Sequence, residues 1–127
     1  MFEQLTQYNN IGLLILRLAV AAIFIYHALP KLRNAKAMSQ AIGMSTGMVF
    51  ALGAVEFASS LGMIFGVYIQ LAGLLLAIVM IRAIYFKTAK WHVPFAAMDK
   101  TGWEFDLIML AANLFIFVNG GGAIGIQ

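Results

Sequence analysis

The chain contains no cysteine, only two prolines and few charged residues. The lack of cysteine excludes disulfide bonds, thiol redox relays and cysteine-ligated metal centres. Charged residues make up 10% of the 127 residues, against about a quarter in a typical soluble domain. The sequence therefore has too little polar surface to keep a chain of this size dissolved in water.

Hydrophobic residues make up 63% of the chain, and they gather in long runs. Four runs cover residues 11–29, 48–66, 71–86 and 104–118, with Glu104 at the edge of the last. Runs of this length can cross, or nearly cross, the hydrocarbon core of a bilayer. We therefore predict an all-α protein in which residues 1–127 form a single domain, a transmembrane four-helix bundle. Residues 1–10 lack a basic region, so we expect the first run to stay in the mature protein.

The segments between the runs differ in character. Residues 30–47 predict a short amphipathic helix on the membrane surface, and Pro30 suits the first position of that helix. The uncharged residues 66–70 predict a tight helical hairpin with Tyr68 and Gln70 at the membrane surface. The glycines at 120–122 are expected to end the fourth helix.

Basic residues lie on one side of the predicted bundle. The two segments on that side carry Lys31, Arg33, Lys36, Lys87, Lys90 and Lys100. The positive-inside rule then places segments 30–47 and 87–103 in the cytoplasm and both termini outside, in the periplasm of a bacterium whose inner membrane holds the protein. Eight scattered Lys and Arg residues do not form a phosphate-binding stripe, so no nucleic-acid partner is expected.

Two opposite charges lie deep within the first two runs. Counted along straight helices, Arg17 and Glu56 differ in depth by about 7 Å, which an extended arginine side chain can cover. We predict that they form an ion pair, because an unpaired charge in hydrocarbon is costly. This pair either only locks two helices together or forms part of a site for a ligand or a proton.

A second group of polar candidates lies mostly toward the inner ends of the helices: His27, Lys31, Arg82, Glu104, Asp106 and Asn113. Arg82 is the expected counter-ion of Asp106 or Glu104. The group predicts either a polar cluster at the inner mouth of the bundle or a belt of charges at the interface. Two histidines far apart in the sequence do not form a metal motif, so no metal site is expected.

Small residues on the second run predict a close-packing face. Gly62 and Gly66 form a GxxxG pair, and Ser59 lies on the same side of the helix. Such a face suits contact either with the chain's own helices or with a second copy of the chain.

The order of these features resembles the DoxX family of small four-helix membrane proteins. The matching stretches are RLAVAAIFIYHALPKL at 17–32, GAVEFASSLGMIFG at 53–66 and GWEFDL at 102–107. In the family an arginine commonly follows the second helix, whereas Ile69 and Gln70 stand here. The resemblance implies a subunit of a thiosulfate:quinone oxidoreductase, or a membrane partner of soluble redox and sulfur-transfer proteins.

Three functions follow as hypotheses. The first is a small subunit or membrane anchor of a redox system, linked to quinone, sulfur or oxidative stress, in which Arg17 and Glu56 bind a quinone head group beside Phe24, Phe57 or Trp103. Its partners are then other membrane or soluble redox subunits. The second is a non-catalytic assembly component or homo-oligomer. The third is a small transporter or proton conduit that uses Glu56, Asp106 and His27. No nucleophile with a neighbouring base is evident, so catalysis by the chain alone is not expected and catalytic residues stay unassigned.

Overall fold

The computed structural model describes residues 2–125, and this part of the chain is helical without strands. Its elements are η1 (Glu3–Tyr8), α1 (Asn9–Arg33), α2 (Ala35–Ile42), α3 (Thr46–Phe65), α4 (Ile69–Tyr85), η2 (Phe86–Lys90) and α5 (Trp103–Asn119). The four predicted apolar runs correspond to α1, α3, α4 and α5. The all-α prediction is confirmed for the described residues.

Three helical stretches are long and apolar enough to cross a membrane. They are Glu3–Arg33, Thr46–Phe65 and Ile69–Lys90. The helix α5 has 17 residues and is not among them. Large apolar side chains also face outward, among them Ile15, Ile78 and Ile108, which are each more than half exposed. Such a surface suits contact with lipid.

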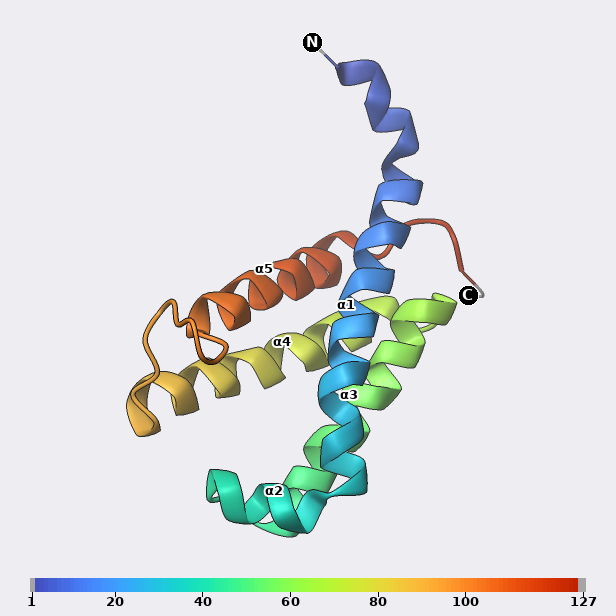
Figure 1. Ribbon diagram of the computed structural model, residues 1–127. Coiled ribbons are helices and arrows are strands. Elements are labelled where there is room, and N and C mark those ends of the chain that lie inside the picture. The colour runs from blue at the N-terminus through green and yellow to red at the C-terminus, as the bar shows by residue number, and fades with distance from the viewer. Residues whose placement is uncertain (1, 126–127) are drawn as a thin grey trace.

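The long helices form two antiparallel pairs (Figure 1). The helix α1 packs along α3, and α4 packs along α5, while α3 and α4 join the two pairs. In Figure 1 the α1–α3 pair runs downward and the α4–α5 pair runs to the left, so the pairs diverge away from the α3–α4 turn. Because α1 and α5 make few contacts, the predicted four-helix bundle is not confirmed. The buried core lies where the pairs meet and includes Val20, Met63, Leu76 and Ile116.

Pro30 does not begin a new helix, so this part of the prediction is wrong. The helix α1 continues through Pro30 to Arg33, where the backbone N–H of Asn34 donates to the Pro30 carbonyl at 2.7 Å. Proline lacks an N–H and its ring crowds the carbonyl four residues earlier, but the residues that follow it can still bond to earlier carbonyls. The short helix α2 then begins at Ala35. Lys31 therefore belongs to α1 and not to a surface loop.

The α3–α4 connection is a short turn formed by Gly66, Val67 and Tyr68. Gly66 ends α3 with a φ of 73°, in the left-handed region that glycine adopts most easily. Tyr68 is 76% exposed, and Gln70 donates to the Phe117 carbonyl of α5 at 2.9 Å. The turn is thereby tied to the end of the other helix pair.

The glycine-rich segment after α5 returns over this turn. The segment passes α1 and reaches the end of α3 (Figure 1). A Cβ atom on Gly66 would collide with the Cα of Gly125, and one on Gly121 would lie 2.9 Å from the Cδ of Arg17. Glycine is therefore needed here for close approach of the backbones as well as for the turn.

Replacing Gly66 with alanine should destabilise the protein. The substitution places a side chain in the left-handed region and against Gly125, and a cost of about 2 kcal/mol is expected. Thermal unfolding in mild detergent, followed by circular dichroism, would show a lower midpoint. Gly12→Ala is the matched control, because Gly12 lies within α1 with no atom near its Cβ position. Equal midpoints for the two variants would contradict this packing.

Candidate functional site

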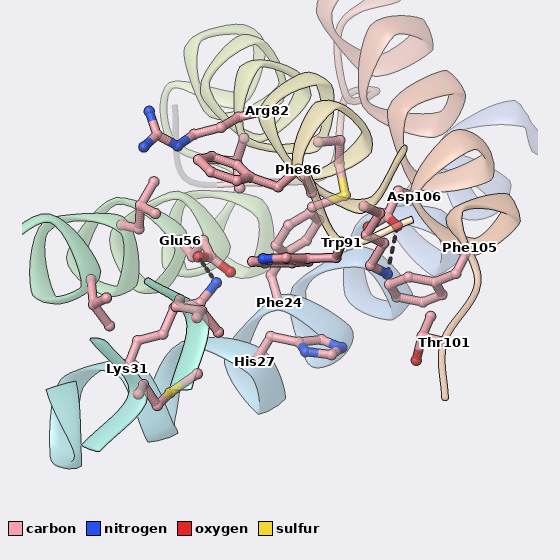
Figure 2. A pocket seen from close by; sticks show the side chains of 18 of the residues that line it. Phe24, His27, Lys31, Glu56, Arg82, Phe86, Trp91, Thr101, Phe105 and Asp106 are labelled. Carbon is pink, nitrogen blue, oxygen red and sulfur yellow. Dashed lines mark hydrogen bonds and ion pairs between the residues drawn. The ribbon is translucent and has the colours of Figure 1, made fainter. Parts of the chain in front are cut away.

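A cavity of about 410 Å³ lies between the two helix pairs at the end that carries the basic segments. Every helix from α1 to α5 contributes to its lining, as do η2 and the segment before α5. Most of the wall is apolar and includes Phe24, Phe86 and Phe105, while charged and polar side chains project into it (Figure 2). This inner cavity is the candidate functional site.

Glu56 forms an ion pair with Lys31, and the predicted pair with Arg17 is wrong. The Glu56 side chain is 1% exposed, and the Lys31 ammonium donates to its Oε2. Gly53 allows α1 to come this close, since a Cβ there would lie 2.8 Å from the Cβ of Lys31. Lys31 reaches Glu56 because α1 extends beyond Pro30, and the pair joins α1 to α3 on the wall of the inner cavity.

Arg17 is fully buried at the opposite end of the molecule, where it binds backbone carbonyls. Its Nε donates to the Met63 carbonyl at 2.9 Å, in the last turn of α3. Its Nη1 donates to the carbonyls of Gly121 at 3.1 Å and Ile124 at 2.6 Å. The carbonyls at the end of a helix lack partners within the helix and carry partial negative charge, so they suit a cation. Arg17 therefore ties the C-terminal segment to α1 and α3.

Lys87 and Asp106, which both line the inner cavity, form a second ion pair. The Lys87 Nζ lies 2.6 Å from Oδ2 of Asp106, which is 3% exposed. The expectation that Arg82 pairs with Asp106 or Glu104 is therefore wrong. The π-helical turn η2 continues α4 and carries Lys87 back toward α5. Glu104 is exposed.

Sequence reasoning missed Lys87 and Trp91 as members of the site. Both line the inner cavity. The Trp91 ring packs against Phe86, with 5.5 Å between the ring centroids. In the sequence, both residues belong to a basic, aromatic segment, and that pattern indicates only a loop at the membrane surface. His27 also lines the cavity and lies 5.7 Å from Phe105 between ring centroids.

The remaining candidates lie outside the inner cavity. Asn113 is fully buried between α4 and α5, where its Nδ2 donates to the Met109 carbonyl at 2.8 Å. Ser59 is buried on α3, and a Cβ on Gly62 would lie 2.7 Å from the Val67 carbonyl. Together with the contact of Gly66 with the C-terminal segment, this shows that the GxxxG pair packs within the chain.

Within residues 2–125 no group of three or more histidine, aspartate or glutamate side chains is placed to hold a metal ion. Phe24 lines the inner cavity, whereas Phe57 and Trp103 do not. The arrangement combines an apolar chamber with two internally neutralised ion pairs, which suits a largely apolar ligand that accepts hydrogen bonds.

Comparison with known proteins identifies the family. A family model named DoxX matches residues 12–89, which is more than half of the chain. The chain belongs to the DoxX family. With its three apolar helical stretches, this DoxX protein is a multi-pass membrane protein.

The DoxX chain is also similar to a Bacillus subtilis (strain 168) protein named "Putative oxidoreductase CatD". The two are 29% identical over 114 residues, which cover 87% of this chain and 81% of the relative. No solved structure matches the chain.

Removing one partner of the Lys31–Glu56 pair should be more harmful than removing both. Glu56→Gln leaves the Lys31 ammonium without its carboxylate in a largely buried place, at an expected cost of about 3 kcal/mol. Lys31→Met combined with Glu56→Gln should recover much of that loss. Thermal unfolding in detergent measures both. If Arg17→Met rescued Glu56→Gln and Lys31→Met did not, the observed pairing would be wrong.

Proposed function

We propose that this DoxX protein is a membrane subunit of a redox system and that its inner cavity binds a quinone head group. The observation that carries the proposal is the cavity itself, whose volume of about 410 Å³ lies within the range of small-molecule sites. The name of the Bacillus subtilis relative, "Putative oxidoreductase CatD", supports a redox role.

The chemistry of the wall fits a quinone. Phe24, Phe86 and Phe105 offer aromatic surfaces for a flat ring, and His27 and Trp91 are nitrogen-bearing rings beside them (Figure 2). Within residues 2–125 neither the His27 nor the Trp91 side chain has a hydrogen-bond partner, although the Trp91 backbone N–H donates to the Phe86 carbonyl. Their N–H groups can therefore donate to the two carbonyl oxygens of a quinone.

The ion pairs give the cavity a fixed shape. Lys31–Glu56 joins α1 to α3, and Lys87–Asp106 joins the end of α4 to α5, so each wall is tied to its neighbour. A bound quinone supplies the capacity to take up electrons and protons. The protein orients the head group and keeps it apart from bulk water, while a partner oxidoreductase docks near residues 91–102 and supplies the electrons.

The same two ion pairs favour a second candidate function, a non-catalytic assembly component. In that case they only hold helices together, and the cavity binds nothing specific. Binding of a quinone at Trp91 separates the two functions.

Trp91 is a built-in reporter of quinone binding, because the chain has two tryptophans and only Trp91 lines the inner cavity. In a Trp103→Phe variant, a short-chain ubiquinone or menaquinone analogue should quench the remaining fluorescence in a saturable manner. Quenching in a Trp91→Phe variant should be weak and linear, as for simple partition into the micelle. Saturable quenching of Trp103 and none of Trp91 would contradict the proposed site.

We further propose that α5 is a fourth span and that both termini lie outside the cytoplasm. The 17 residues of α5 extend about 26 Å, close to the bilayer core, and α5 runs back along α4. The absence of cysteine allows a direct test with single-cysteine variants in intact bacterial cells. A membrane-impermeant maleimide should label Ala123→Cys before lysis and Ala96→Cys only afterwards. The reverse pattern would contradict this orientation.

A further inference from the structure

Arg82 lies at the rim of the inner cavity without a carboxylate partner. Its Nη2 lies 3.7 Å from the Sδ of Met44, and its guanidinium carbon lies 5.0 Å from the ring centroid of Phe86. Within residues 2–125 it forms no ion pair, and its buried Nε has no hydrogen-bond partner. A half-buried guanidinium with a buried, unpartnered N–H is costly to leave without an anion.

A second cation adjoins the same ring. The Nζ of Lys90 lies 4.8 Å from the ring centroid of Phe86. Lys90 also lacks a carboxylate partner in the described part of the chain. Two like charges held around one aromatic ring repel each other, and an anion between or beside them would neutralise that repulsion.

We propose that Arg82 and Lys90 bind the phosphate of an anionic membrane lipid. The surface of α4 next to Arg82 is apolar and open: Ile78, Ile81 and Tyr85 are each more than half exposed, and they lie one turn apart along the helix. An acyl chain can lie along this stripe while its head group meets the two cations. Anionic lipids are attracted by such basic residues at a membrane surface.

The lipid site adjoins the proposed quinone site, because Arg82 and Phe86 also line the inner cavity. Figure 2 shows the Arg82 guanidinium directed away from Trp91 and His27. The lipid phosphate would meet the side of Arg82 that faces away from these two rings, and the lipid proposal does not depend on quinone binding.

Native mass spectrometry of the full chain in detergent tests the lipid site. The probes are phosphatidylglycerol and phosphatidylcholine with identical acyl chains. The wild type should retain phosphatidylglycerol preferentially. Arg82→Gln should weaken that retention about tenfold, as expected for loss of a charge-assisted hydrogen bond, and Lys90→Gln about two- to fivefold. Arg82→Lys should restore part of the preference, and phosphatidylcholine binding with unchanged helix content would show that the variants are folded.

Arg33→Gln is the matched control, because Arg33 is an exposed arginine at the end of α1. It should leave the preference unchanged. Equal retention of the two lipids by the wild type, or an equal loss in Arg33→Gln, would overturn the proposal. So would displacement of the lipid by inorganic phosphate alone, which would indicate a site for a free anion. Quinone binding is measured separately, by fluorescence quenching. A negative result for one ligand therefore leaves the proposal for the other ligand unaffected.

Discussion

The ion pair between Lys31 and Glu56 fixes α1 against α3, because neither charge is stable in hydrocarbon without the other. At the opposite end the buried Arg17 also needs polar partners, and it donates to backbone carbonyls of α3 and the C-terminal segment. The end near Arg17 is thereby closed by close-packed glycine backbone. The helix pairs diverge toward the other end, where charged side chains and aromatic rings surround the inner cavity.

The closed end and the end with the cavity differ in their ability to bind a ligand. Nε and Nη1 of Arg17 donate to backbone carbonyls of the chain, so the residue serves as a structural tie even though its buried Nη2 has no partner. At the inner end Lys31 and Lys87 have carboxylate partners, whereas His27 and Trp91 keep unused hydrogen-bonding groups and Arg82 lacks an anion. Hydrogen-bond donors on the wall of a largely apolar cavity suit a neutral ligand with carbonyl oxygens, and a cation at its rim suits a phosphate.

The helices were predictable from the sequence, since apolar runs of this length have few alternatives to helices in a bilayer. The partners of the charges were not. Pro30 suggests that helix one ends there, which groups Lys31 with the polar candidates at the inner mouth and leaves Arg17 as the expected partner of Glu56. The true partners of Arg17 include carbonyls more than 100 residues away, and a carbonyl has no sequence signature. Lys87 was assigned to a loop because the π-helical turn that redirects it has no clear pattern.

The proposed function requires that the inner cavity binds a quinone. Its most direct test is the quinone content of protein purified in mild detergent, measured by solvent extraction and mass spectrometry and compared with Ala83→Trp. Ala83 lines the cavity, and a tryptophan there would fill much of the space without changing any charge. The wild type should carry quinone in near-stoichiometric amount and the folded variant should carry very little. Equal quinone content in both proteins, or none in either after purification from quinone-containing membranes, would contradict the claim.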